Sequence, residues 1–195
     1  MDRPRTAGRQ IALFLVLAAA GCAADLLTKH WAFSRTDLLA GQVRWLWPGH
    51  VGVQLSLNEG ALFGMGQGRV AWFAAFSLIA CVAIPWWLFR RGGADDWRLV
   101  AVLGAVMGGV LGNLYDRLGL HGLDWGIFTP SRAGEPIYAV RDFILFAGRW
   151  EPDPAKRIVW PNFNVADALL VCGAGMLLLL SLRHTANHGG DDPSS

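Results

Sequence analysis

Four long apolar stretches divide the chain, and polar segments of unequal length separate them. They cover residues 11–28, 70–89, 99–115 and 165–182. A helix needs about 20 mostly apolar residues to cross the hydrocarbon core of a bilayer. Only helices and closed barrels satisfy their backbone in lipid, and these stretches are too long and continuous for barrel strands. The pattern predicts an all-α polytopic membrane protein, residues 1–195 forming one domain with four transmembrane helices.

A second pattern marks the polar segment 29–69, between the first two stretches. Residues 51–57 alternate apolar with polar or small side chains, which is typical of a half-buried strand. Residues 43–47 form another candidate strand, and residues 48–50 carry a turn signal between the two. We expect a small extracytoplasmic β-sheet, a cradle at the lipid surface where tryptophan prefers to lie. The longer segment 117–163 gives no clear pattern.

The basic residues predict which side of the membrane each segment occupies. Segments 1–10, 90–98 and 183–195 hold seven Lys or Arg in 32 positions, whereas segments 29–69 and 117–163 hold ten in 88. Cytoplasmic segments carry an excess of Lys and Arg. We therefore expect both termini in the cytoplasm and the two longer segments on the outer face.

Composition supports a membrane protein. Apolar residues make up 53% of the chain and charged residues 16%, against about a quarter charged in soluble proteins. The net charge of +2 gives no reason to expect nucleic acid as a partner. Cys22, Cys81 and Cys172 lie within apolar stretches, so we expect free buried thiols. No Cys or His pair has zinc-ligand spacing, and we expect neither a metal nor a cofactor.

Ionisable residues in the spans gather at the predicted outer ends. Such residues are costly in lipid and are functional candidates by default. Asp25 and Lys29 are four apart, so they share a helix face and can form an ion pair. Asn113 shares a face with Asp116 in the same way. Asp116 lies at a helix C-terminus, where the dipole disfavours negative charge, so it needs a cation, either Arg117 or Lys29.

Three further polar residues frame the fourth span. Asn164 suits a helix N-cap, and Asp167 in the first turn suits the helix dipole, so both have a structural interpretation. Asp142 lies in segment 117–163 and is followed by Phe-Ile-Leu-Phe. These apolar residues indicate that the segment returns to the membrane surface. That return would bring Asp142 close to Asp167.

These residues fall into five blocks, in order along the chain, that resemble the lipoprotein signal peptidases (signal peptidase II) over nearly the whole sequence. The blocks are residues 25–29, 58–64, 108–117, 140–143 and 163–167. The resemblance implies an aspartic endopeptidase of the bacterial inner membrane. It would remove signal peptides from prolipoproteins, just before a diacylglyceryl-modified cysteine, at the outer face.

The resemblance also implies roles for individual residues. Asp142 and Asp167 would be the catalytic pair. Residues implied to shape the site or hold substrate are Asn164, Asn113, Asp116, Arg117, Asn58, Gly60, Asp25, Lys29 and Ala166. Expected partners are prolipoproteins and membrane lipids, for a chain that we expect to be a monomer. The links 117–141 and 143–163 look longer than is usual in the family, which bears on lid motion and substrate choice.

Two aspartates suit peptide hydrolysis. An ionised carboxylate can take a proton from water while a protonated one donates to the carbonyl oxygen. Two close carboxylates share a proton and titrate as a pair. No G-x-S-x-G or H-E-x-x-H motif offers a different reaction.

Three other interpretations stay open. The chain could be an inactive peptidase-like protein that binds lipidated peptides, or a small transporter, because intramembrane charges also mark ion pathways. It could also be a lipoprotein itself, since Ala19-Ala20-Gly21-Cys22 follows a basic N-terminus and an apolar stretch, as in a lipoprotein signal peptide.

Overall fold

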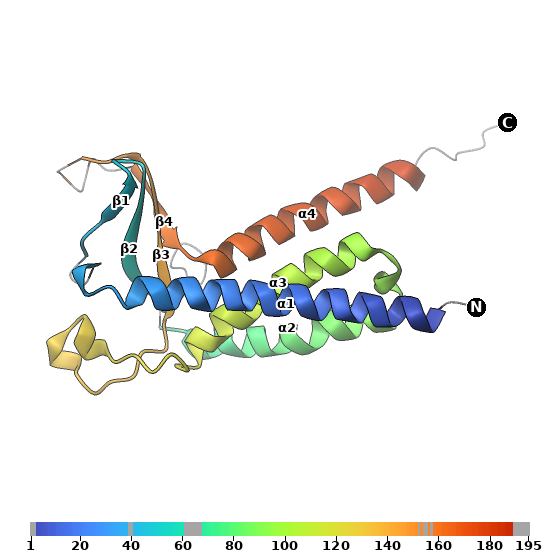
Figure 1. The fold of residues 1–195 in the computed structure, drawn as a ribbon, viewed down its shortest axis with the longest axis horizontal. Helices are drawn as coiled ribbons and strands as arrows, with labels where there is room; N and C mark the ends of the chain where they lie inside the picture. Colours follow the sequence, from blue (N-terminus) through green and yellow to red (C-terminus); the bar gives the residue numbers. More distant parts are fainter. Residues whose placement is uncertain are drawn as a thin grey trace.

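The fold combines four long helices with one small sheet (Figure 1). The computed structural model describes residues 3–38, 41–60, 68–151, 153, 156 and 158–188. The main elements are α1 (Arg3–Phe33), β1 (Arg44–Trp47), β2 (Val51–Asn58), α2 (Val70–Arg90), α3 (Trp97–Arg117), β3 (Val140–Arg149), β4 (Ile158–Phe163) and α4 (Val165–His188). Short 3-10 turns are η1 (Thr36–Leu38), η3 (Gly93–Asp95), η4 (Trp125–Ile127) and η5 (Pro130–Arg132).

The helices run lengthwise, and all four strands lie at one end of them, together with η4 and η5 (Figure 1). We call this end the sheet end. The start of α1 and the last turn of α4 lie at the opposite end. Every polar residue expected to form the site lies at or near the sheet end.

All four predicted spans are confirmed as helices long and apolar enough to cross a membrane. The helices are longer than the predicted stretches. Residues 29–33 continue α1, so Lys29 is helical and not part of a loop. The fourth helix continues to His188 rather than ending at 182. Helical hydrogen bonding does not stop where apolar side chains do, so hydropathy underestimates helix length.

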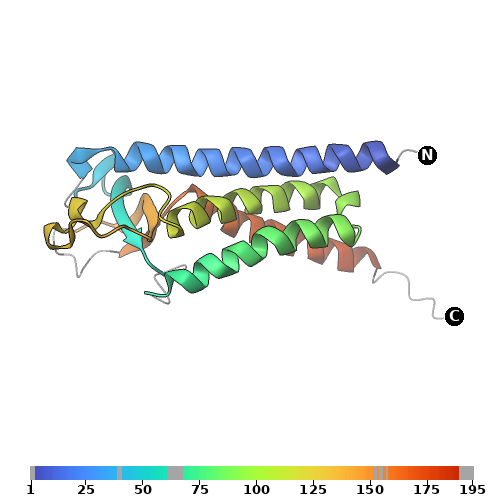
Figure 2. The ribbon, with the colours of Figure 1, turned by 90° about the horizontal axis from the view of Figure 1, so that it is seen from below.

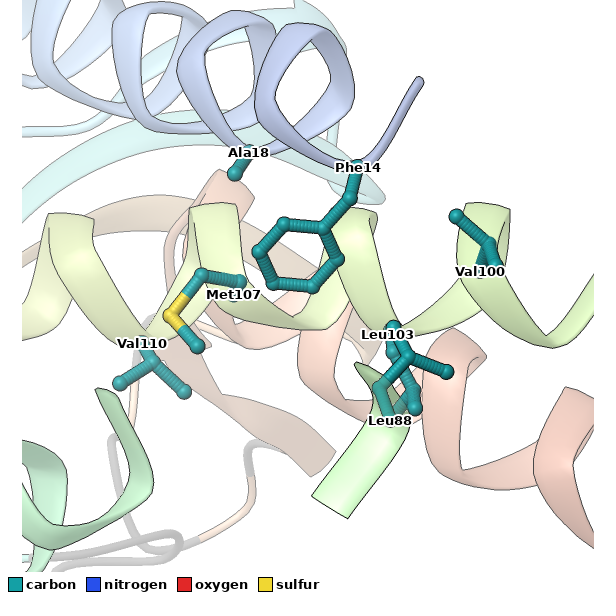
Figure 3. Packing of buried hydrophobic residues seen from close by; sticks show 7 residues of the cluster. All are labelled: Phe14, Ala18, Leu88, Val100, Leu103, Met107 and Val110. Atoms are coloured by element: carbon teal, nitrogen blue, oxygen red, sulfur yellow. The ribbon is translucent and has the colours of Figure 1, made fainter. Parts of the chain in front are cut away.

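Helix α3 is the central element of the bundle. Of its most apolar window, 61% is buried inside the protein, against 11% to 17% in the other three helices. Figure 2 shows it between α1 and α2. Buried side chains of α1, α2 and α3 form one core, with Phe14 pointing from α1 toward α3 (Figure 3). That core is Phe14, Ala18, Leu88, Val100, Leu103, Met107 and Val110.

Glycines let α3 approach its neighbours closely. A Cβ on Gly108 would lie 2.9 Å from the carbonyl oxygen of Ala18 and 2.9 Å from the Cα of Gly21 on α1. A Cβ on Gly109 would lie 2.7 Å from the carbonyl oxygen of Ala166 on α4. Small residues at such crossings allow backbone-to-backbone contact in membranes. The lipoprotein-like segment ending at Cys22 is thus part of a continuous, packed helix.

The cysteines are only partly as expected. They form no disulfide, but the expectation that they are buried is wrong for Cys172, which is exposed on α4. Cys22 and Cys81 are half-buried. An apolar stretch in a spanning helix faces lipid as well as protein, so hydropathy alone does not predict burial.

The sheet is antiparallel, with strand order β1-β2-β3-β4. The predicted hairpin is confirmed: β1 and β2 pair across a turn that His50 N closes by donating to Trp47 O at 3.0 Å. A second buried cluster of Ala32, Leu38, Val53, Leu55 and Phe143 joins the sheet to the end of α1.

The segment that gave no pattern, 117–163, contains β3 and β4. The first four residues of β3 are all buried, so this strand lacks the alternation that marks a half-buried strand. In the register of β2 and β3, Ser56 pairs with Asp142. In the register of β3 and β4, Ile144 pairs with Phe163, which brings Asp142 near the start of α4.

Candidate active site

A buried cluster of charges connects α1, α3 and β3. Lys29 Nζ lies 2.7 Å from Asp25 Oδ2 and 3.0 Å from Asp116 Oδ2, and all three side chains are completely buried. Arg141 donates to Asp116 Oδ1 from Nη2 at 2.7 Å and from Nε at 3.0 Å, and its backbone N–H donates to Oδ2 at 2.9 Å. The cluster holds two cationic and two acidic side chains that contact one another directly, as buried charges require.

The contacts in this cluster show which of the two candidate cations, Lys29 or Arg117, pairs with Asp116. The ion pair between Asp25 and Lys29 is confirmed, and Lys29 also binds Asp116. Arg117 as the partner of Asp116 is wrong. Adjacent helical residues point about 100° apart, so Arg117 faces away. It donates instead to Gly60 O, at 3.3 Å.

Arg141 is the residue that sequence reasoning missed. It stands next to Asp142 in a strand too buried to alternate, and it was not assigned a partner. The sequence around Arg141 contains a signal for this role: an Arg within an apolar run is expected to be buried, and a buried Arg needs a carboxylate partner. Its side-chain and backbone bonds to Asp116 fix the start of β3 against the end of α3.

An amide links the charge cluster to Asp167. Lys29 Nζ donates to Asn113 Oδ1 at 2.9 Å, which turns the Nδ2 group of Asn113 the other way. That Nδ2 donates to Asp167 Oδ1 at 2.9 Å. Lys29 thereby sets the orientation of the amide that holds Asp167.

Asn164 connects both carboxylates of the expected catalytic pair. Its Nδ2 donates to Asp142 Oδ1 at 2.6 Å and to Asn113 Oδ1 at 3.2 Å. Its backbone N–H donates to Asp167 Oδ2 at 3.3 Å, and its Oδ1 accepts from the N–H of Asp167 at 2.9 Å. The reciprocal bonds form an N-terminal cap for α4, as expected from the sequence. One residue therefore caps the helix and holds the two aspartates together.

Asp25 and Ala166 fix the start of α4 against α1. The backbone N–H of Ala166 donates to Asp25 Oδ1 at 2.9 Å, and Ala166 is completely buried. Gly112 of α3 makes room for this contact, since a Cβ there would lie 2.9 Å from the carboxyl carbon of Asp25. The side chain at position 25 thus anchors the helix that carries Asp167.

The remaining expected residues lie where β2 ends. Asn58 Oδ1 accepts from the N–H of Gly60 at 2.9 Å, and the Asn58 side chain also hydrogen-bonds to Asp142. Gly60 O in turn accepts from Arg117. The rest of that sequence block, residues 61–64, lies outside the described residues. All eleven residues expected at the site are connected through these contacts.

The two aspartates have different surroundings. Asp142 is 2% exposed. Burial raises the pKa of Asp142 to about 7, the negative charge of Asp167 pushes it in the same direction, and hydrogen bonds from Asn164 and Asn58 act against both. Asp167 is half-buried and lies in the first turn of α4, where the helix dipole suits a negative charge. The arrangement favours a proton on Asp142.

The raised pKa of Asp142 predicts a pH-dependent stability. The folded protein binds this proton more tightly than the unfolded chain, whose carboxyl has its ordinary pKa of 3.8. The resulting stability, on the order of 4 kcal/mol, is fully present below about pH 4 and is lost as the pH rises through about 7. We expect Asp142→Asn to abolish this decrease in stability with rising pH, as measured by thermal unfolding in detergent. An equal pH dependence in Asp142→Asn and in an Asp37→Asn control would contradict it.

A cavity of about 230 Å³ opens beside Asp167, between the sheet and α4. Asn58 and Asp167 are at its polar side. Its other walls are mainly apolar, with Trp160 and Phe163 from β4 and Val171 from α4. The half-buried carboxylate can therefore be reached by a molecule that has an apolar part.

Fold and site together define a four-helix membrane protein with paired, unequal carboxylates at one end of the bundle. A family model for signal peptidase (SPase) II matches residues 17–183. The chain belongs to this signal peptidase II family. With its four apolar helices it is a membrane-embedded hydrolase of the signal peptidase type.

Curated relatives agree with that assignment. The lipoprotein signal peptidase of Rhodopirellula baltica is 43% identical over 171 residues, which cover 87% of this chain and 71% of the relative. That of Symbiobacterium thermophilum is 31% identical over 167 residues, covering 86% and 92%. That of Rhodococcus jostii is 34% identical over 181 residues, covering 92% and 77%.

Solved structures share the fold. A bacterial membrane enzyme determined by the in meso method at 2.3 Å resolution superposes with a TM-score of 0.67 at 19% identity, over 95% of this chain and 96% of that one. Another, at 1.9 Å resolution, gives 0.64 at 22% identity, over 88% and 93%. The predicted combination of four spans and a small sheet is therefore confirmed.

Proposed function

We propose that the protein removes signal peptides from prolipoproteins, cutting just before a diacylglyceryl-modified cysteine, by aspartic peptidase chemistry. The observation that carries the proposal is the position of Asn164. It binds Asp142 through its side chain and Asp167 through its backbone, so one residue holds the two carboxylates near each other. Membership of the signal peptidase II family and relatives named lipoprotein signal peptidase support the substrate.

The unequal surroundings assign a role to each aspartate. Asp167, ionised, takes a proton from a water molecule as that water attacks the scissile carbonyl carbon. Asp142, protonated, donates its proton to the carbonyl oxygen, which gives a neutral tetrahedral intermediate. Asp167 then passes its proton to the leaving amine, the C–N bond breaks, and Asp142 recovers a proton from the intermediate. The two groups thus exchange protonation states and return to the start within one turnover.

The remaining site residues hold this pair in place. Asn113 and Asn164 fix the carboxylates, and Lys29 orients Asn113. The buried charges lie outside the reacting pair, and they add rigidity without competing for the substrate. Preorganised hydrogen bonds of this kind need no rearrangement during the reaction. No metal or other cofactor enters the proposed mechanism.

The depth of the site suits a lipid-attached substrate. The sheet end is proposed to face the outer side of a bacterial inner membrane, with both termini in the cytoplasm, as the basic residues indicate. The apolar cavity beside Asp167 then opens at the level of the membrane surface. It suits an acyl chain of the modified cysteine. Both aspartates come from one chain, so we propose that a monomer in the lipid bilayer is sufficient.

A transporter is less consistent with the structure. Transporter sites lie near the middle of the bilayer, between repeated halves. Here the charges lie at the sheet end, and the described elements alternate helices with a sheet rather than repeating. An inactive binder would keep the same apolar cavity, so only an assay of cleavage separates it from an enzyme.

The test is a gel-shift assay with purified protein in lipid, below pH 7, where Asp142 keeps its proton. We expect cleavage of a diacylglyceryl-modified prolipoprotein and no cleavage of the same protein without the modification. Binding of the modified protein without cleavage would establish the inactive binder. Equal cleavage of both forms would contradict the proposed substrate.

A further inference from the structure

A second hollow lies beside Arg117 and shares no lining residue with the apolar cavity. It is a groove of about 610 Å³, lined on one side by α2 and on the other by residues 117–138. This second wall is formed by the end of α3 and by the segment that carries η4 and η5.

The α2 side of the groove is a stripe of small apolar residues. Ala71, Ala74, Ala75 and Leu78 follow the three- and four-residue spacing of one helix face. Ala71 and Ala75 are exposed and four residues apart. Small residues at this spacing let a second helix approach closely within a membrane. The stripe extends over about 12 Å of helix, at 1.5 Å per residue.

The other end of the groove is polar and carries charge. Arg117 and Arg132 line it together with one acid, Glu59. Arg132 lies over the ring of Trp125, 4.1 Å from its centroid, and binds Glu135. Arg117 makes no ion pair with any residue in the described part of the chain. The groove thus combines an apolar wall with a guanidinium at the sheet end that forms no direct ion pair within the described residues.

The groove also communicates with the catalytic pair. Arg117 donates to Gly60 O, the N–H of Gly60 donates to Asn58, and the Asn58 side chain hydrogen-bonds to Asp142. A molecule in the groove that reaches Arg117 therefore lies close to the reaction centre. The apolar cavity approaches the same centre from the side of Asp167.

We propose that this groove receives the apolar helix of the substrate's signal peptide, packed on the alanine stripe of α2. The inference rests on the proposed function. A signal peptide enters the membrane with its C-terminus outward, so the negative end of its helix dipole and its last free carbonyls would meet Arg117. A stripe of alanines suits a helix, whereas the smaller cavity lined by Trp160 and Phe163 suits an acyl chain. The two apolar parts of the substrate, its signal-peptide helix and its acyl chain, would thus occupy separate hollows beside the scissile bond.

The test compares two substrates with the double variant Ala71→Leu/Ala75→Leu. One substrate is a full-length modified prolipoprotein, and the other is a modified peptide that begins a few residues before the cleavage site. We expect KM for the full-length substrate to rise about tenfold, because leucines prevent close helix approach, with kcat nearly unchanged. The short peptide should be cleaved as by the native protein.

The matched control is Ala83→Leu, the same change at an exposed position nearer the opposite end of α2. It should leave KM unchanged for both the full-length substrate and the short peptide. An unchanged KM for both substrates in the double variant would overturn the proposal. It would indicate that membrane lipid, and not the signal peptide, occupies the groove. An equal loss with both substrates would also overturn it, since the stripe would then serve the enzyme's own packing. If the native protein cuts neither substrate, the proposed function itself fails.

Discussion

Asp142→Asn and Asp167→Asn are each expected to lower turnover by roughly 10³-fold or more while leaving the protein folded and inserted. Asparagine keeps the size and most hydrogen bonds of aspartate but cannot exchange a proton at neutral pH. Asn164 can still cap α4 and contact both positions, so the loss should appear in kcat rather than in yield. The measurement is single-turnover cleavage in lipid, with thermal unfolding to verify the fold.

The control for this pair is Asp37→Asn, an exposed aspartate in η1 near the sheet end. It should retain native turnover. Near-native turnover by either Asp142→Asn or Asp167→Asn would remove that residue from the mechanism. A stable but inactive Asp116→Asn variant, beside an active Asp142→Asn variant, would assign the catalytic pair to Asp116 and Asp167.

Lys29→Met is expected to destabilise the protein by roughly 3–5 kcal/mol, because it leaves a buried carboxylate without its cation. Lys29 contacts Asp25 and Asp116, and none of the three side chains is exposed. The same change frees the amide of Asn113, so activity should fall even in the folded fraction. The measurements are the denaturation midpoint in detergent and turnover per folded molecule.

A second variant separates lost charge balance from lost packing. Asp25→Asn/Lys29→Met removes one charge of each sign and leaves Asp116 paired with Arg141. The asparagine can still accept the hydrogen bond from Ala166. We expect the double variant to recover much of the stability that Lys29→Met loses. A double variant as unstable as the sum of both single changes would show that the charges do not act as a unit.

The fold was largely predictable because a bilayer imposes strong constraints on sequence. Four apolar stretches of sufficient length have few alternatives to spanning helices, and the alternation at 51–57 is equally direct. Strand β3 was not predictable. It is buried against α1 on one side and paired on both edges, so its sequence is apolar without the period of two.

The site was predictable where local spacing brings groups together. Asp25 with Lys29, and Asn164 with Asp167, are neighbours on one helix. Contacts between elements distant in sequence were not accessible in the same way. The bond from Arg141 to Asp116 joins residues 25 positions apart, and nothing in the spacing selects it over Arg117. The apolar run after Asp142 predicted that it lies close to Asp167, but only the family resemblance indicated that the two form a catalytic pair.

The central position of α3 has a consequence for how the protein is made. Its mean hydropathy of 1.5 is the lowest of the four spans, and it carries Asn113, Asp116 and Arg117 at one end. Such a segment partitions poorly into lipid alone. Helix α1, which is synthesised earlier, already holds Lys29 to neutralise Asp116. We therefore expect α3 to enter the bilayer only when it is already packed against α1. Membrane insertion would then depend on the same buried charges that hold the proposed active site together.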